Sequence, residues 1–314
     1  MPSSIFTAQS NLPTSVKIIE VGPRDGLQNE AFSISPEIKI ELINRLTSAG
    51  FANIEAASFV SPKWVPQMAA SEQVMAGIKR KPGVIYSGLT PNMKGFEAAL
   101  AAGMDEVVIF GSASEAFSQK NINCSIQESI ERFRSVALAA KENRIRLRGS
   151  ISCAFGCPYQ GLVSPKAVAE VVKQLRDLGC DEIDIADTIG VGTPRHVQTV
   201  MKHAMEEFPI ARLSGHFHDT YGQALANIYA SLEVGIQIFH SSVAGLGGCP
   251  YAVGATGNVA TEDVLFMLQG LDIKTGINLD KVVDAGQFIS NHMGRKAVSR
   301  AGNAIVAKRA VRQD

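Results

Sequence analysis

Four side chains suited to binding a divalent cation stand at the ends of strand-like segments. His216 and His218 are two residues apart, so on a strand both imidazoles would lie on one face. A single strand histidine is more often structural, whereas this pair makes metal ligation an equal alternative. Asp25 follows the first strand-like segment and Asn258 follows the last. One carboxylate, two imidazoles and one amide oxygen, with no thiolate, favour Mg²⁺ or Mn²⁺ over structural zinc.

Three charged side chains near these candidate ligands have both a chemical and a structural interpretation. Arg24 precedes Asp25 and could stabilise an anion that develops beside a metal, or form a salt bridge across the mouth of a barrel. Glu55 lies in the second strand-like segment and could orient a metal ligand or a bound water, or pair with Arg24. Asp187 could be a carboxylate that neighbouring hydroxyl groups satisfy. All three are therefore candidates for the active site.

Cys249 is the cysteine with the clearest chemical context. Three of the four residues before it are glycine and Pro250 follows, so its loop can move and let its backbone approach a ligand. A thiol on such a loop is a candidate acid or base. The chain has five cysteines and no C-x-x-C pair, which predicts reduced thiols in the cytoplasm rather than a disulfide framework. Packing is expected for the other four, Cys124, Cys153, Cys157 and Cys180.

The elements that must position these side chains alternate between strand-like and helix-like segments, with no linker or low-complexity tract. Proline behind a serine or threonine at Ser35, Ser164 and Thr193 predicts capped helix starts. Helices are expected at residues 36–49, 66–79, 126–141, 165–178 and 194–207. Short segments rich in Ile, Val or Phe predict strands at residues 16–22, 53–59, 84–90, 106–111, 146–153, 182–188, 212–219 and 238–245.

This alternation predicts a (β/α)8 TIM barrel, whose active site lies at the carboxyl ends of the strands. The competing fold is an open doubly wound sheet, but its usual G-x-G-x-x-G fingerprint does not follow the first strand. We expect a single catalytic domain over residues 1–314, with the barrel at about 16–270 and a C-terminal helical extension and tail at about 271–314. An extra helix is expected at 278–291, and the basic tail from Gly294 is expected to be mobile. Closure of the barrel would bring the first and last units, and with them the four candidate ligands, together.

Composition excludes several classes of protein. The chain has 314 residues, with 30 Lys and Arg against 30 Asp and Glu, so it has no bulk positive field for nucleic acid. No stretch approaches about 18 uncharged apolar residues, so no membrane span is expected. The first 15 residues lack the features of a signal or transit peptide. These observations favour a cytoplasmic enzyme of small molecules.

Several longer motifs resemble the 3-hydroxy-3-methylglutaryl-CoA lyase family, and the resemblance covers every predicted unit. The glycine-rich cysteine loop together with GPRDGLQNE is specific to this family, whereas the wider metal-dependent superfamily shares only the R-D and H-x-H elements. The matching motifs are EVGPRDGLQNE, FVSPKWVPQM, LTPNMKGFEAA, NINCS, SCAFGCPYQG, DTIGVGTP, HFHDTYGQALAN and VAGLGGCPYA.

The resemblance implies a metal-dependent cleavage of 3-hydroxy-3-methylglutaryl-CoA to acetyl-CoA and acetoacetate, as in leucine breakdown, by a homodimer of TIM barrels. It implies that Asp25, His216, His218 and Asn258 bind the metal. Arg24 would contact the acyl group, Cys249 would act in catalysis from its loop, and Glu55 and Asp187 would support activity. Gln28, Asp187 and Thr188 are further expected substrate contacts.

Three alternatives to this function remain open. The chain could be an acyl-CoA condensing enzyme of the same superfamily, a lyase for a longer 3-hydroxy-3-alkylglutaryl-CoA, or a catalytically silent barrel used for binding. Loss of a metal ligand would favour the silent barrel, and all four expected ligands are present.

Overall fold

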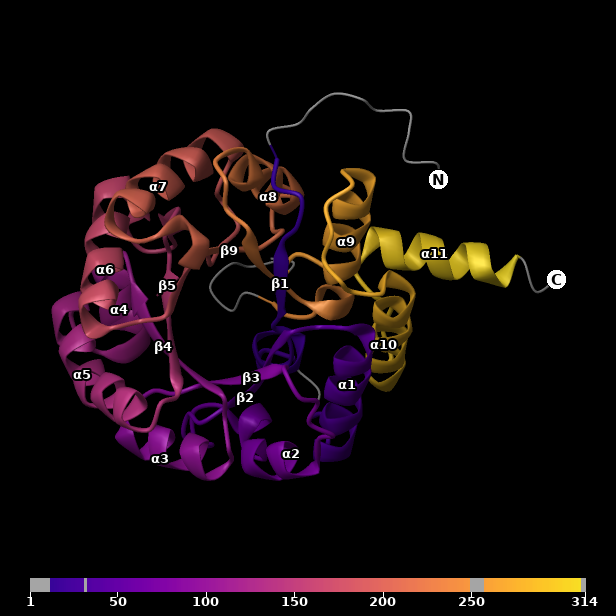
Figure 1. Ribbon diagram of the computed structural model, residues 1–314, viewed down its shortest axis with the longest axis horizontal. Helices are drawn as coiled ribbons and strands as arrows, with labels where there is room; N and C mark the ends of the chain where they lie inside the picture. The colour runs from indigo at the N-terminus through magenta and orange to yellow at the C-terminus, as the bar shows by residue number, and fades with distance from the viewer. Residues whose placement is uncertain (1–11, 31–32, 249–256, 312–314) are drawn as a thin grey trace.

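The computed structural model describes residues 12–30, 33–248 and 257–311, which wind into a ring of strands surrounded by helices (Figure 1). Parallel strands close the ring in the order β1-β10-β9-β8-β5-β4-β3-β2, so the predicted TIM barrel is confirmed. The strands of the ring are β1 (Lys17–Glu20), β2 (Asn53–Ser58), β3 (Ile85–Leu89), β4 (Glu106–Ser112), β5 (Arg146–Ser152), β8 (Glu182–Asp187), β9 (Leu213–Phe217) and β10 (Ile238–Ser241).

Helices cover the outside of this ring, and a short antiparallel hairpin follows β5 (Figure 1). The hairpin pairs β6 (Gly156–Cys157) with β7 (Gly161–Leu162). Within the described ranges, no helix has the length and apolar character needed to cross a membrane. The helices are α1 (Pro36–Ala49), α2 (Ser71–Gly77), α3 (Met93–Ala101), α4 (Glu115–Ile122), α5 (Ile126–Glu142), α6 (Pro165–Leu178), α7 (Pro194–Glu207), α8 (Ala224–Glu233), α9 (Thr261–Gly270), α10 (Leu279–His292) and α11 (Arg300–Ala310).

Helices α1, α6 and α7 start at the prolines where the sequence places them, but not for the expected reason. The side chains of Ser35, Ser164 and Thr193 do not cap the first turns of these helices. The Ser35 hydroxyl instead bonds the carboxylate of Glu37. The proline at the first helical position is compatible with these starts, because it has no N–H to satisfy and its φ already suits a helix.

Two other local expectations were wrong. The helix expected at 66–79 is a single 3₁₀ turn followed by α2, and the Ser71 hydroxyl at that break bonds the backbone of Ser58 and Met68. The expected mobile tail is instead the helix α11. Its Arg309 pairs with Asp280 and Asp284 of α10. The sequence of the tail alone does not indicate these tertiary contacts.

The apolar core fills the layer between the barrel and its helices, where one continuous cluster includes residues from almost every element. The inside of the ring is different, because its apolar side chains include a small separate cluster of Ile19, Val21 and Ile238. Much of the remaining interior is charged and fully buried, as at Arg148 and Glu106. The interior of the barrel therefore contains buried charged side chains as well as apolar ones.

Candidate active site

Barrel closure brings the first and last units of the chain together at the carboxyl ends of the strands. Immediately after β1, a π-helical turn at Gly22–Gly26 holds Arg24 and Asp25. His216 lies in β9, and the backbone of His218, just beyond it, bridges to Asn258 in an antiparallel manner. Segments more than 200 residues apart in sequence thus meet at one point, as the four-ligand prediction requires.

The four candidate ligands lie close together. The Asn258 amide donates a hydrogen bond to Asp25 Oδ2 at 2.8 Å, and its Oδ1 lies 2.7 Å from His216 Nε2. His216 Nε2 is 3.8 Å from Asp25 Oδ2, and the rings of His216 and His218 are 5.5 Å apart at their centroids. Ligand atoms of Asp25, His216 and His218 all lie within 4.8 Å of one another, which is compact enough for one ion.

The charge state of these groups also suits a cation. Burial opposes ionisation of Asp25, but Arg24 and the two histidines hold the pKa of its carboxyl well below the usual range. Burial and the neighbouring His216 lower the pKa of His218 to about 4, so its ring is neutral near pH 7 and one of its nitrogens offers a lone pair. His218 Nδ1 is buried and has no hydrogen-bond partner among the described residues. The donor set and this orphaned nitrogen fit Mg²⁺ or Mn²⁺.

Glu55 lies between two guanidinium groups beside the ligands. It forms buried ion pairs with Arg24 and with Arg148, and Arg24 also pairs with Asp25 at 2.8 Å. Burial would raise the pKa of Glu55, but the two arginines lower it to about 2. Glu55 therefore remains ionised and holds the Arg24 guanidinium beside the Asp25 carboxylate. The structure shows the salt bridges expected of Arg24, and its role toward a developing anion stays a prediction.

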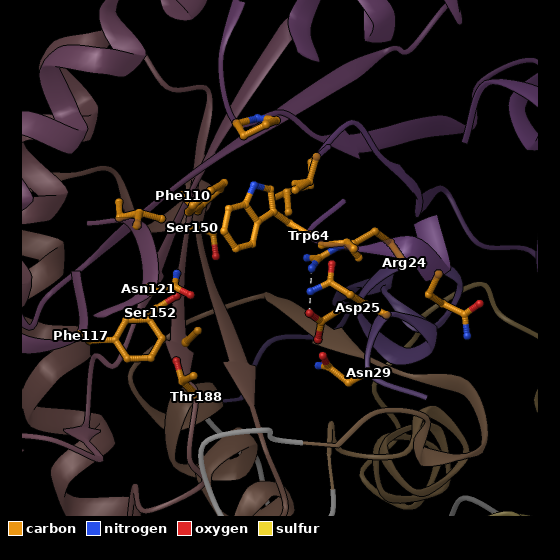
Figure 2. Close-up of a pocket in the computed structure, with 18 of the residues that line it drawn as sticks. Arg24, Asp25, Asn29, Trp64, Phe110, Phe117, Asn121, Ser150, Ser152 and Thr188 are labelled. Carbon is orange, nitrogen blue, oxygen red and sulfur yellow. Dashed lines mark hydrogen bonds and ion pairs between the residues drawn. The ribbon is translucent and has the colours of Figure 1, made fainter. Parts of the chain in front are cut away.

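A cavity of about 1140 Å³ opens above these residues and is lined by Arg24, Asp25, His216 and His218. Figure 2 shows Arg24 and Asp25 on one side of the cavity and Phe110, Phe117 and Thr188 on the other. Trp64 lies between them in this view, and it is 83 % exposed although it lines the cavity. The space is large enough for a substrate with an extended carrier group.

The remaining expected substrate contacts divide between the cavity and its walls. Gln28 and Thr188 line the cavity, and Gln28 Oε1 is buried without a hydrogen-bond partner among the described residues. Asp187 is fully buried, and its carboxylate accepts the backbone N–H groups of Val191 and Gly192 at 3.0 and 2.8 Å. Asp187 therefore shapes the loop that follows β8, and Thr188 is the residue of this pair that faces the cavity.

Cys249, the expected acid or base, lies outside the described residues. Its neighbour Gly248 lines the cavity, and the Gly248 carbonyl accepts a hydrogen bond from Asn29 at 3.2 Å. The described part of the glycine-rich segment thus reaches the same cavity as Arg24 and Asp25.

Sequence reasoning missed two buried residues that support the ligands. Arg148 bonds Glu55 and Glu106 from the interior of the barrel, and His240 Nδ1 lies 3.2 Å from His216 Nδ1. The signal for Arg148 is the polar residue at every second position of β5, Arg146-x-Arg148-x-Ser150, which indicates a polar face turned into the ring. No sequence motif includes His240, and its position opposite His216 becomes evident only when β10 pairs with β9.

Two buried carboxyl groups anchor the loops of the site from behind. Glu20 accepts hydrogen bonds from the backbone of Gly22 and Val243, and Glu262 accepts from Ala244. Burial raises the pKa of Glu20 to about 7 and that of Glu262 to about 8. Ala244 has a left-handed backbone, with φ of 58°, so a fixed acceptor at this turn opposes its relaxation. These contacts connect the Arg24 turn to the start of the glycine-rich segment.

Comparison with known proteins agrees with this geometry. The HMGL-like family model matches residues 15–289. The 3-hydroxy-3-isohexenylglutaryl-CoA/hydroxy-methylglutaryl-CoA lyase of Pseudomonas aeruginosa is 58% identical over 298 residues, which is 95% of this chain and 99% of that protein.

Two solved structures are also similar to this chain. The crystal structure of hydroxymethylglutaryl-CoA lyase from Pseudomonas aeruginosa superposes with a TM-score of 0.94 at 58% identity, covering 95% of this chain and all of that one. An HMG-CoA lyase from Acinetobacter baumannii, solved in complex with coenzyme A and 3-methylmalate, superposes with a TM-score of 0.89 at 36% identity, covering 93% of this chain and 95% of that one. With a family match over most of its length and such close relatives, the chain belongs to the HMGL-like family, the hydroxymethylglutaryl-CoA lyases.

Proposed function

We propose that this chain cleaves (3S)-3-hydroxy-3-methylglutaryl-CoA to acetyl-CoA and acetoacetate with the help of a divalent cation. The observation that carries the proposal is the meeting of Asp25, His216, His218 and Asn258 beside Arg24 in one large cavity. The family of the chain supports a carbon–carbon lyase reaction on an acyl-CoA. The lining also includes two cationic side chains, Lys120 and Arg132, which suit the phosphates of coenzyme A.

The reaction breaks the bond between C2 and C3 of the acyl group. The tertiary hydroxyl at C3 loses its proton and becomes the ketone of acetoacetate, and the bond electrons pass to the thioester as an enolate. Arg24, held in place by Glu55, would stabilise the negative charge on the enolate oxygen. Asp25, His216, His218 and Asn258 would hold a cation that supplies Lewis acidity to the reaction.

Proton transfer completes the balance of the reaction. A base accepts the hydroxyl proton; Asp25 and His216 are the two candidates, and both are also expected metal ligands. Cys249 is proposed to return a proton to the enolate carbon, directly or by relay, which gives the methyl group of acetyl-CoA. Removing one such group typically slows a reaction by about 10²–10⁴.

A second candidate function is cleavage of a substrate with a longer alkyl group at C3. The Pseudomonas aeruginosa relative carries both activities in its name, and it matches this chain over 95% of its length. The cavity wall contains apolar side chains that suit such a group, among them Val65, Leu89, Phe110 and Phe133. The same catalytic groups would serve both substrates, because the reacting bond is the same.

We further propose that the enzyme works as a homodimer in the cytoplasm, in the breakdown of leucine or related branched acids. The family resemblance supports the dimer and the pathway. The sequence has five cysteines and no C-x-x-C pair, which is typical of reduced thiols in the cytoplasm. Size-exclusion chromatography with light scattering tests the dimer, for which twice the 33.5 kDa chain mass is expected.

The function is tested by measuring acetoacetate release from 3-hydroxy-3-methylglutaryl-CoA and from 3-hydroxy-3-isohexenylglutaryl-CoA, each with Mg²⁺ and after exhaustive chelation. We expect cation-dependent acetoacetate from the first substrate. Cleavage of the second at a comparable kcat/KM would establish the wider specificity. Release of free coenzyme A from acetyl-CoA and a 2-oxo acid, without cleavage of either substrate, would instead indicate a condensing enzyme.

A further inference from the structure

His216 belongs to two groups of possible metal ligands, stacked one below the other in the barrel. The upper group is Asp25, His216 and His218, and it faces the cavity. The lower group is Asp184, His216 and His240, and all three of its members are buried. In each group the ligand atoms lie within 4.8 Å of one another, so both groups are compact enough for one ion and the charges around them must distinguish their roles.

The lower group already contains a permanent positive charge. Nη1 of Arg148 lies 3.1 Å from His240 Nε2 and 3.6 Å from Asp184 Oδ2, and the side chain of Arg148 is fully buried. A guanidinium cannot lose its proton in a protein. A divalent cation placed here would face this fixed charge at short range in a medium of low dielectric constant. The lower group is therefore better suited to supporting the upper one than to holding a second ion.

The support acts through the ring of His216. β10 pairs with β9 so that His240 is opposite His216, and the two Nδ1 atoms are 3.2 Å apart. Two imidazole nitrogens at this distance share one hydrogen, so one ring donates and the other accepts. If His216 Nδ1 donates, its Nε2 keeps a lone pair directed at Asp25 and Asn258. If His240 donates instead, the hydrogen of a neutral His216 is on Nε2. That Nε2–H then donates to Asn258 Oδ1, and Nε2 has no lone pair left for a metal.

A carboxylate faces each nitrogen of the His240 ring, with Glu182 Oε1 at 4.0 Å from Nε2 and Asp184 Oδ2 at 3.7 Å from Nδ1. Both distances exceed that of a hydrogen bond, so neither carboxylate fixes the tautomer. The cation site selects it instead, because a neutral His216 that binds a metal through Nε2 carries its hydrogen on Nδ1, where His240 Nδ1 is the neighbour. Arg148 does not select between the two forms, because its Nη1 lies at 3.1 and 3.3 Å from the two ring nitrogens.

We propose that His240 is a positioning residue that accepts the Nδ1–H of His216 and so holds Nε2 of His216 free to bind the divalent cation. Histidine ligands of metals commonly donate their other nitrogen to a partner that fixes ring and tautomer. Here that partner is a second histidine on the neighbouring strand, and Arg148 contacts its ring. The inference rests on the cation site of the proposed function.

The test measures Mn²⁺ affinity of the full-length chain without substrate, by electron paramagnetic resonance of the free ion. His240→Phe keeps a ring of similar shape but offers no acceptor, and we expect its Mn²⁺ dissociation constant to rise about 10- to 100-fold. His240→Asn can place an amide oxygen near the position of Nδ1, and it should retain most of the affinity. Ser87→Ala is the matched control, because Ser87 Oγ contacts Arg148 at 3.3 Å without touching His216; its affinity should not change.

Circular dichroism and the thermal midpoint establish that each variant is folded, and His240→Leu replaces His240→Phe if the latter is not. The inference would be overturned if His240→Phe bound Mn²⁺ with wild-type affinity. It would also be overturned if His240→Phe and His240→Asn lost equal amounts of Mn²⁺ affinity. Wild-type turnover separates this result from the proposed function: an active wild type with an unaffected His240→Phe refutes only the role of His240. A wild type that binds Mn²⁺ but does not cleave the substrate refutes only the function.

Discussion

Replacing Glu55 by glutamine should destabilise the protein substantially, because it removes one negative charge between two buried guanidinium groups. The Glu55 side chain is 1 % exposed, and it pairs with Arg24 and Arg148. Removing one partner of a buried ion pair typically costs 3–5 kcal/mol, roughly, because the other charge stays buried. The value here should lie at the lower end, since Arg24 keeps Asp25 and Arg148 keeps Glu106.

The pKa of Glu55 gives a similar magnitude by a separate route. The pKa of Glu55 in the folded protein is about 2, well below its ordinary value of 4.5. At about 1.4 kcal/mol for each pKa unit, this lowering corresponds to about 3 kcal/mol. Because the folded pKa is depressed, this stability is present above pH 4.5 and is lost as the pH falls through about 2. The gap between wild type and Glu55→Gln should therefore narrow over the same window.

Thermal unfolding at pH 7 is the assay, with Glu41→Gln as the matched control. Glu41 pairs with Arg45 at 2.7 Å, but both side chains are more than 40 % exposed, so this change should cost less than about 0.5 kcal/mol. A loss of about 3 kcal/mol should lower the midpoint of Glu55→Gln by roughly 6 °C or more. A midpoint within about 1 °C of wild type at pH 7 would refute the account of Glu55 as the charge that holds the two arginines.

Three further predictions follow from the site. His218→Ala should weaken Mn²⁺ binding by at least about 100-fold while the thermal midpoint stays within a few degrees, by equilibrium dialysis and calorimetry, because the ring is a ligand at the edge of the cavity. Trp64→Ala should raise KM for the acyl-CoA several-fold with little change in kcat or stability, since this 83 % exposed ring lines the cavity; an unchanged KM would contradict a contact with the substrate. Glu262→Gln should gain stability relative to wild type as the pH rises from 5 to 9. Burial raises the pKa of Glu262 to about 8, so the wild type loses stability as its carboxyl ionises, and glutamine cannot ionise. A difference in unfolding free energy between the two proteins that does not change with pH would argue against a buried neutral carboxyl.

The strands and the proximity of the four candidate ligands could be predicted from sequence, because they depend on short-range patterns and on the closure of the barrel. Strand β8 begins at Glu182 as expected, and β10 begins at Ile238. Once a barrel is inferred, its ring makes the first and last units neighbours, so Asp25 and Asn258 could be brought together without any coordinates.

The errors lie where tertiary contacts override local signals. Ser164 and Thr193 are good capping residues by type, yet neither side chain bonds the first turn of its helix. The C-terminal segment looked solvated because its basic residues have no partners nearby in sequence, and Arg309 finds them on α10. His240 was overlooked for the same reason, since its contact with His216 depends on the pairing of β10 with β9.

The most direct test of the central claim is an anomalous-diffraction map from a crystal of the full-length chain grown with Mn²⁺. The account predicts one strong peak at bonding distance from the side chains of Asp25, His216, His218 and Asn258. A peak between Asp184 and His240, or four side chains that surround no ion at saturating Mn²⁺, would contradict it.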